Sequence, residues 1–347
     1  MAAIPNYEDT GDTVVDIDRE RPTRTKPRSI DLLAGIRNGD WLDSQEFPDV
    51  EFHIPEVIPE GLTLLVAPPK AGKSWLALQF ALELAVGGHV LGNVQVVQRP
   101  TLYLALEDSD RRMKSRCRKL LGTIRRTPGA FNFITQVSPD HALPTIEAFL
   151  DAHANEAPLV VLDTLGKVMP ASLPGESAYQ RDYRVAGSLK ALADDCPGAA
   201  VVVVHHDRKA ASEDFVDAVS GTHGLAGAAD TIVVLARKRH ETTALLKVTG
   251  RDIEERELAV EFTDGCYWRL SGTSIADSAA RAEQARQVDG LGDRSAEIVA
   301  YVTSRMPDGA SAGELDNRFG EGASRSAARL VERGTLAKPK RGIYVIP

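Results

Sequence analysis

The stretch Ala67-Pro-Pro-Lys-Ala-Gly-Lys-Ser74 matches the phosphate-loop pattern G-x-x-x-x-G-K-[ST] at every fixed position except the first. The apolar run at residues 62–66 predicts a buried parallel strand before it, and residues 75–86 predict a helix behind it. Backbone N–H groups and a helix N-terminus would then converge on one anion. The stretch therefore predicts a nucleotide site, the alternative being an accidental Gly-Lys-Ser at a helix start.

The loop residues have separate expected roles. Lys73 is expected to reach the β- and γ-phosphates, and Ser74 to hold Mg²⁺. Ala67 stands where the pattern has glycine; its Cβ restricts the turn, although Pro68 and Pro69 offer another way to fix the geometry. The predicted nucleotide contacts are Ala67, Pro68, Pro69, Lys70, Ala71, Gly72, Lys73, Ser74 and Trp75.

The composition is that of an ordinary globular protein. The 347 residues are 43% hydrophobic, enough for one large core and a small appended domain. A net charge of −8 gives no global attraction to nucleic acid or membrane, so any basic surface must be local. The three cysteines lack metal-ligand spacing. Without a signal-peptide pattern or a bilayer-spanning apolar stretch, the sequence predicts a cytoplasmic protein with no membrane partner.

Short β-rich runs alternate with helical stretches after the loop. They lie at residues 101–106, 131–134, 159–162, 200–204 and 231–235. This alternation predicts an α/β fold with a mainly parallel sheet flanked by helices. The closely spaced runs at 242–248, 257–262 and 266–270 predict an antiparallel C-terminal extension.

The two ends of the chain differ from this core. Residues 1–33 carry few apolar positions and predict a flexible N-terminal arm. Residues 34–272 form the expected core, whose first part is a lead-in that packs on the core or on a neighbouring subunit. Residues 273–290 predict a polar linker, and residues 291–347 predict three short helices and a hairpin resembling a winged helix.

Two carboxylates, Glu107 and Asp108, directly follow the strand predicted at 101–106. Ligands of parallel α/β sheets sit at this end of the strands. Glu107 is therefore the candidate catalytic acid/base that orients or deprotonates the attacking water, while Asp108 is expected to cap the following helix. The alternative is that Glu107 is itself a cap.

Two further strands also end in polar side chains. Residues 158–162 lead to Asp163, the pattern of the strand that positions Mg²⁺ in phosphate-loop NTPases, with a turn residue as the alternative. Residues 201–204 lead to His205 and His206. We select His205 as the γ-phosphate sensor and His206 as its substitute; a structural histidine is the alternative. Adjacent strand residues point to opposite faces, which argues against a histidine metal site.

These motifs, in this order, resemble the RecA-like AAA family ATPases of plasmid and phage origin, and in particular the RepA-type hexameric replicative helicases. The resemblance covers about residues 35–270, includes Gly39-Asp-Trp-Leu42, and is specific for the ATPase core rather than for helicase activity. It implies ATP and Mg²⁺ as cofactors. It also implies that Lys73 and Ser74 hold phosphate and Mg²⁺, that Glu107 activates water, that Asp163 positions Mg²⁺, and that His205 couples phosphate state to DNA-binding loops.

The resemblance further implies a hexameric ring in which a neighbour completes each ATP site. Arg251 is the arginine-finger candidate and Lys247 its companion; the alternative is an ordinary hairpin-turn arginine. Loops 167–184 and 207–223 would contact single-stranded DNA, the first through Tyr179, Arg181 and Arg184 and the second through Arg208 and Lys209. Acidic residues dilute both loops, so solvated loops are the alternative.

The C-terminal region is locally basic, with six basic residues and one acidic residue between 322 and 347. Arg325, Arg329 and Arg333 recur every four residues and share one helix face. That face could enter the major groove of double-stranded DNA, with Lys340 and Arg341 on the backbone. A protein-binding winged helix is the alternative.

The sequence therefore favours an ATP-driven DNA motor, a ring-shaped replicative helicase of a mobile element or phage, with a replication initiator or loader as a partner. The first alternative is a RecA-like recombination or repair ATPase. The second is a DNA-binding replication or regulatory protein switched by ATP. A small-molecule kinase fits least, because no acceptor pocket or lid is visible in the sequence.

Overall fold

The computed structural model describes residue 33 and residues 35–122, 125–206, 223–238, 240–289, 293–320, 322–332 and 334–347. It divides into two compact units, Met1–Asp49 and Val50–Pro347. In the first unit, the side chain of Asn38 caps the short helix α1 (Gly39–Asp43) by accepting from the backbone of Trp41. Residues 1–32, most of the predicted flexible arm, lie outside the described residues.

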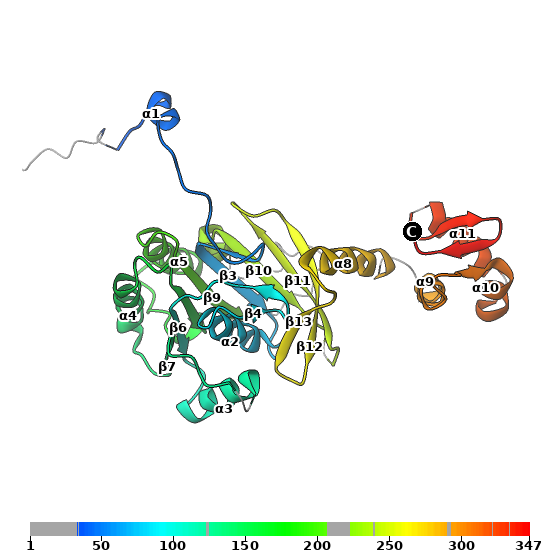
Figure 1. Ribbon diagram of the computed structural model, residues 1–347. Helices are drawn as coiled ribbons and strands as arrows, with labels where there is room; N and C mark the ends of the chain where they lie inside the picture. Colours follow the sequence, from blue (N-terminus) through cyan, green and yellow to red (C-terminus); the bar gives the residue numbers. More distant parts are fainter. Residues whose placement is uncertain are drawn as a thin grey trace, which may run out of the picture. The chain divides into compact units, whose positions relative to one another are not determined.

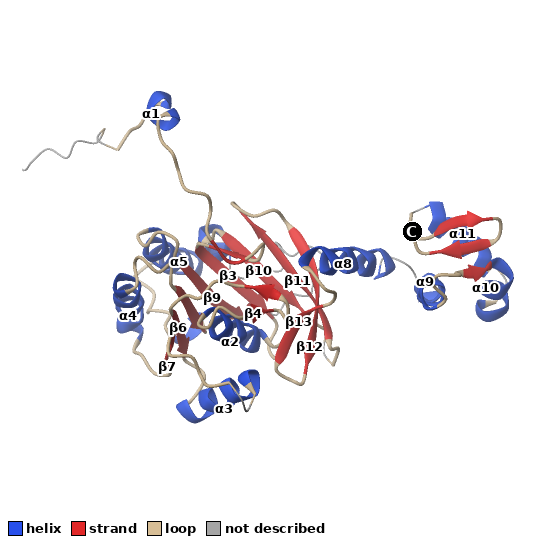
Figure 2. Cartoon of the chain, in the orientation of Figure 1, coloured by secondary structure: helices blue, strands red, loops and turns tan. Residues whose placement is uncertain are grey.

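A nine-stranded sheet in the order β13-β12-β11-β10-β3-β9-β8-β6-β7 organises the described part of the second unit (Figures 1 and 2). From β10 through β3, β9, β8 and β6 to β7, neighbouring strands pair in parallel. The strands β10, β11, β12 and β13 pair with one another antiparallel. The prediction of a largely parallel sheet flanked by helices is confirmed, and the antiparallel strands lie where the sequence predicted them. The strands are β3 (Gly61–Ala67), β6 (Thr101–Ala105), β7 (Phe131–Ile134), β8 (Leu159–Asp163), β9 (Ala200–His206), β10 (Thr231–Ala236), β11 (Thr243–Gly250), β12 (Arg256–Thr263) and β13 (Tyr267–Leu270).

Helices cover both faces of this sheet because its central strands are apolar on both sides (Figure 2). Along β3, Leu65 joins the cluster under α2 (Lys73–Leu84) and α3 (Asp110–Leu121), whereas Leu64 joins the cluster under α4 (Pro139–Ala152) and α5 (Ala178–Asp194). Ten of the twelve residues of α2 are buried. The phosphate-loop helix is therefore enclosed by the core on nearly every side.

The carboxyl ends of the parallel strands meet at one edge of the sheet. Ala105 of β6 pairs with Asp163 of β8, and Ala67 of β3 pairs with His206 of β9. The polar residues at these strand ends are therefore neighbours in space. The remaining small elements are β1 (Phe52–Ile54), β2 (Ile58–Pro59), β4 (His89–Val90), β5 (Val94–Gln95), η1 (Leu165–Lys167) and α7 (His223–Ala228).

The segment predicted as a linker contains α8 (Ile275–Asp289). The hydroxyl of Ser278 on this helix donates to the carbonyl of Ala259 on β12 at 2.6 Å, so α8 packs against the antiparallel strands. No helix in the described ranges is long and apolar enough to span a bilayer.

The last elements enclose a small apolar core of their own, which includes Ile298, Leu315, Leu330 and Tyr344. The side chains of Ser311 and Glu314 form a reciprocal capping box at the start of α10 (Ala312–Phe319), the second helix of these elements. The elements are α9 (Asp293–Ser304), β14 (Ala310–Ser311), α10 (Ala312–Phe319), α11 (Ala323–Glu332), β15 (Ala337–Lys340) and β16 (Ile343–Val345), whose strands form a three-stranded sheet.

Candidate active site

The phosphate loop turns through two residues with left-handed backbones, Lys70 (φ 66°) and Gly72 (φ 101°). A Cβ on Gly72 would lie 3.0 Å from the ring of Trp268, whose Nε1 donates to the carbonyl of Gly72 at 3.1 Å. Ala67, in contrast, is the fully buried last residue of β3 and does not have a positive φ. The Cβ that we expected to restrict the turn is thus accommodated in extended strand backbone.

The loop forms one wall of a cavity of about 530 Å³. The cavity is also lined by Glu107 and Asp163, which the sequence predicted at the ends of two other strands. Its charged lining residues are the cations Lys70, Lys73, Arg112, Arg116, Lys119 and Arg237 and the carboxylates Glu107, Asp108 and Asp163. This excess of positive charge suits a polyphosphate.

Lys73 is buried and its Nζ lies 2.7 Å from Nδ1 of His206. A lysine ammonium only donates, so Nδ1 is the acceptor and the neutral ring carries its proton on Nε2. Burial lowers the pKa of Lys73, while the carboxylates of Asp163 and Glu107 raise it. Burial and then the charge of Lys73 lower the pKa of His206. His206 therefore favours the neutral form that this contact requires.

Glu107 is half exposed, and its Oε1 lies 3.8 Å from Nε2 of His206. It faces the cavity while its neighbour Asp108 is buried against Arg116 and lies 3.4 Å from Arg112. The cap of α3 is Ser109, whose hydroxyl accepts from the backbone of Arg112. The predicted capping role of Asp108 is therefore wrong: its carboxylate is committed to the two arginines instead.

Asp163 is buried, and its two carboxylate oxygens differ in environment. Oδ2 accepts a hydrogen bond from the Tyr103 hydroxyl at 2.6 Å, whereas buried Oδ1 has no partner among the described residues. The same hydroxyl lies 3.3 Å from the carbonyl oxygen of Ser74, so Asp163 and Ser74 are close together. An unpartnered carboxylate oxygen beside a serine fits Mg²⁺, which takes few protein oxygen ligands and completes its shell with water and phosphate. The described residues contain no cluster of three or more His, Cys, Asp or Glu that could hold a metal.

Three other predicted site residues lie away from this cavity in their own chain. His205 is partly buried and pairs with Val66, with its side chain on the opposite face of β9 from that of His206. Arg251 follows Gly250, which pairs with Thr231 at the opposite edge of the sheet, and its guanidinium lies 3.6 Å from Asp230. Lys247 lies 2.9 Å from the carboxylate of Glu257.

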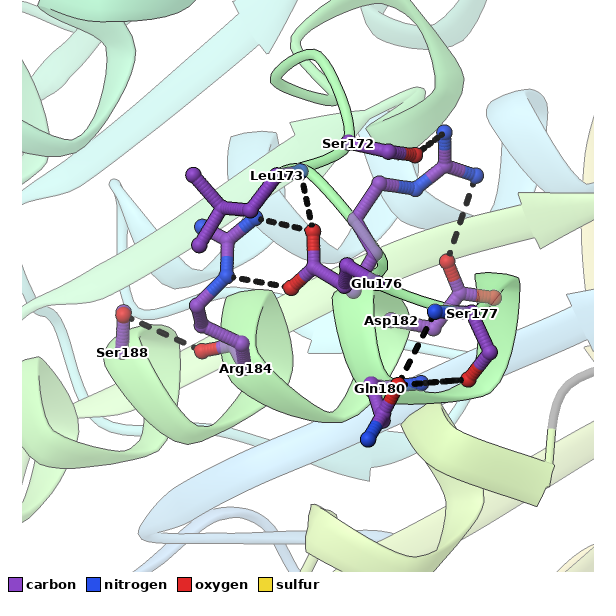
Figure 3. Close-up of polar contacts among 9 residues, drawn as sticks. Ser172, Leu173, Glu176, Ser177, Gln180, Asp182, Arg184 and Ser188 are labelled. Atoms are coloured by element: carbon purple, nitrogen blue, oxygen red, sulfur yellow. Dashed lines mark hydrogen bonds and ion pairs between the residues drawn. The ribbon is translucent and has the colours of Figure 1, made fainter.

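The first predicted DNA-binding loop is internally paired (Figure 3). Glu176 accepts from Arg184 at 2.7 and 2.9 Å, an interaction that lowers the pKa of Glu176 to about 2. Arg181 lies 3.5 Å from Asp182. Tyr179 is exposed and stacks on Tyr183 with ring centroids 6.2 Å apart. The predicted loop 167–184 is helical from residue 178 onward, so both arginines lie on α5, each beside a carboxylate of the same segment. Residues 207–222 of the second loop, with Arg208 and Lys209, lie outside the described residues.

Sequence reasoning did not select several residues that line or adjoin this site, and Arg237 and Tyr103 are two of them. Arg237 follows β10, donates to the carbonyl of Ala71 at 3.3 Å, and lies 4.4 Å from the ring of Phe262. Its position after a strand that ends at the same edge was a usable signal. Tyr103 lies inside the apolar run of β6, where its hydroxyl gave no pattern to detect.

The phosphate loop follows one parallel strand, and Glu107 and Asp163 lie at the carboxyl ends of the neighbouring strands β6 and β8. This arrangement is that of the RecA-like P-loop ATPases. The chain belongs to the AAA domain family, whose model matches residues 28–212.

Several solved structures are similar to this chain in fold. A DnaB-like replicative helicase, solved with its interactions with primase, is 14% identical over 60% of this chain and 57% of its own, with a TM-score of 0.49. A KaiC-like protein from Pyrococcus horikoshii OT3 is 15% identical over 65% of this chain and 100% of its own, with a TM-score of 0.45. The RadB recombinase is 17% identical over 61% of this chain and 91% of its own, with a TM-score of 0.43.

Proposed function

We propose that this protein hydrolyses ATP and couples hydrolysis to movement along single-stranded DNA, as a ring-shaped replicative helicase of a phage or mobile element. The observation that carries the hydrolytic part is the meeting of Lys73, Glu107 and Asp163 around one cationic cavity. A cytoplasmic location is part of the proposal.

The chemistry follows from the positions of these side chains. The loop amides and Lys73 bind the phosphates, and Glu107 orients the attacking water and accepts its proton. Ser74 and Asp163 would hold Mg²⁺, which neutralises charge on the β- and γ-phosphate oxygens when bound. The ammonium group of Lys73 donates a hydrogen bond to His206. A bound phosphate would therefore compete with His206 for the ammonium group of Lys73.

The coupling to DNA is proposed through the end of β9. His206 is the last residue of this strand and directly precedes the predicted DNA loop at 207–223. A change in its hydrogen bonding therefore acts at the base of that loop. Exposed Tyr179 offers a stacking surface for a base, whereas Arg184 would have to leave Glu176 to contact phosphate.

The ring is proposed because Arg251 and Lys247 do not line the cavity of their own chain. A head-to-tail neighbour could bring the edge that carries Arg251 to the cavity edge of the next subunit. Mixing Lys73→Ala protein with Arg251→Ala protein tests this arrangement. Shared sites should restore part of the ATPase activity; two folded, inactive partners with no restored activity would argue against Arg251 acting in trans.

The C-terminal elements are proposed to be a winged helix that contacts double-stranded DNA. Arg325 and Arg329 are exposed on α11, while Arg333 lies outside the described residues. Lys340 and Arg341 are exposed on the hairpin that follows. A replication initiator or loader stays a predicted partner.

One paired measurement separates the helicase from its alternatives. ATPase rate is measured with and without single-stranded DNA, alongside unwinding of a forked duplex. A helicase shows DNA-stimulated ATPase and unwinding. Stimulation without unwinding favours a recombination ATPase, and ATP-dependent duplex binding with little turnover favours a regulatory switch.

A further inference from the structure

Tyr103 is a fully buried tyrosine whose hydroxyl reaches the proposed Mg²⁺ site. It pairs with Val161 across β6 and β8, so Asp163 lies two residues farther along on the same face. From this position the hydroxyl contacts Oδ2 of Asp163 at 2.6 Å and lies 3.3 Å from the carbonyl oxygen of Ser74. One phenol thus contacts both elements that carry the predicted Mg²⁺ ligands.

The hydrogen bond has a defined direction. An ionised carboxylate only accepts, so the phenol donates its single proton, and the shorter distance assigns that proton to Asp163. Burial and the negative charge of Asp163 both raise the pKa of Tyr103, which keeps the donor protonated. A hydrogen bond from a neutral donor to a buried charge is stronger than one between neutral groups.

We propose that Tyr103 is the positioning residue of the Mg²⁺ site: by binding Oδ2 it fixes the Asp163 carboxylate before metal arrives and leaves Oδ1 as the metal ligand. This inference rests on the proposed ATPase function. Buried Oδ1, which has no partner in the described ranges, supports it, because such an oxygen is costly unless a ligand completes it. Without the hydroxyl, both oxygens of Asp163 lose their fixed orientation.

The test is Tyr103→Phe, which removes the hydroxyl and retains the ring packed near Phe131. Binding of a fluorescent ATP analogue is titrated without Mg²⁺ and at increasing Mg²⁺ concentration. We expect the Mg²⁺-free Kd to stay within about twofold, while the Mg²⁺ concentration at half-maximal effect rises about tenfold, the scale for residues that orient metal ligands.

Tyr344→Phe is the matched control. Tyr344 is also buried, and its hydroxyl donates to the carbonyl of Ser324 at 3.1 Å within the C-terminal elements. This variant should keep the Mg²⁺ midpoint of the unchanged protein. If Tyr103→Phe does not fold by circular dichroism, Tyr103→Met provides an adaptable apolar side chain without the hydroxyl.

The outcomes separate the two levels of the proposal. If the wild-type protein does not bind the analogue, or binds it with no effect of Mg²⁺, the proposed function is overturned. If the wild-type protein shows a clear Mg²⁺ effect and a folded Tyr103 variant has the same Mg²⁺ midpoint, only the role of Tyr103 is overturned. Equal weakening with and without Mg²⁺ also overturns it, because the effect would then be general damage to the pocket.

Discussion

Nζ of Lys73 lies 2.7 Å from Nδ1 of His206, although the two residues are 133 positions apart in the sequence. The contact joins the phosphate loop to the end of β9. Nε2 of the same imidazole approaches Glu107 at 3.8 Å, so the histidine stands between the phosphate-binding lysine and the proposed base. Binding of a γ-phosphate by Lys73 would release one side of this imidazole.

His206 should therefore matter more for turnover than His205. We expect His206→Ala to lower kcat at least about tenfold, because it removes the group that contacts Lys73 and approaches Glu107. His205→Ala changes the opposite face of β9 and should have the smaller effect on kcat. Steady-state ATPase assays on both folded variants provide the comparison, and a larger loss for His205→Ala would favour His205 as the γ-phosphate sensor.

Glu107 and Asp108 are adjacent carboxylates with different expected roles. Glu107→Gln should retain ATP binding and lower kcat by about 100-fold or more, because the amide cannot accept the proton of the attacking water. Asp108→Asn should mainly lower thermal stability, because it weakens a buried contact with Arg116. Nucleotide titration, single-turnover hydrolysis and thermal melts distinguish them. A stable Asp108→Asn protein that binds ATP without turnover would reverse the assignment.

The sequence alone was sufficient to predict the strands of the sheet and the carboxylates that follow or end them. Each central strand is a short apolar run, and Glu107 and Asp163 follow such runs directly, so the carboxyl edge could be predicted by counting along the chain. The sequence favoured His205 over His206 without a physical basis for the choice, because β9 continues to His206 and a one-residue shift exchanges the two faces of a strand.

Side-chain contacts between separate parts of the chain also could not be predicted from the sequence. Glu176 accepts two hydrogen bonds from Arg184, a pairing that the sequence did not predict, so Arg184 must leave this carboxylate before it can contact a phosphate. Tyr103 reaches Asp163 only because β6 and β8 are neighbours in register. Arg237 enters the cavity because β10 lies beside β3. Each case depends on strand order or loop geometry, and neither is encoded in local residue patterns.

His53 should make folding stability depend on pH. It is buried in β1; Nε2 donates to the carbonyl of Gly198 at 2.8 Å, and Nδ1 has no partner among the described residues. Burial lowers its pKa from 6.5 to about 3. Below pH 6.5 the unfolded chain therefore binds a proton at His53, whereas the folded chain does not. The contribution of neutral His53 to the free energy of unfolding is fully present above pH 6.5. It is lost as pH falls toward 3, at up to about 1.4 kcal/mol per pH unit.

Urea unfolding between pH 7 and pH 5.5 measures this dependence. The control is His53→Gln, whose amide can still donate to Gly198 but does not titrate. We expect the free energy of unfolding to fall less steeply with decreasing pH in the variant. Equal slopes for the two proteins would show that His53 is not the group responsible.

Ala67 and Gly72 should differ in how much a substitution costs and in whether it weakens ATP binding, because they occupy different backbone conformations. Ala67→Gly increases the backbone freedom of the unfolded chain at a buried strand position, so it should cost about 1 kcal/mol of stability. The Kd for ATP should stay within about threefold. Gly72→Ala places a Cβ at positive φ against Trp268 and should cost about 1–3 kcal/mol and weaken ATP binding. Calorimetric melts and nucleotide titrations provide both values. A tenfold tighter Kd for Ala67→Gly would show that the alanine does constrain the loop, which its extended backbone argues against.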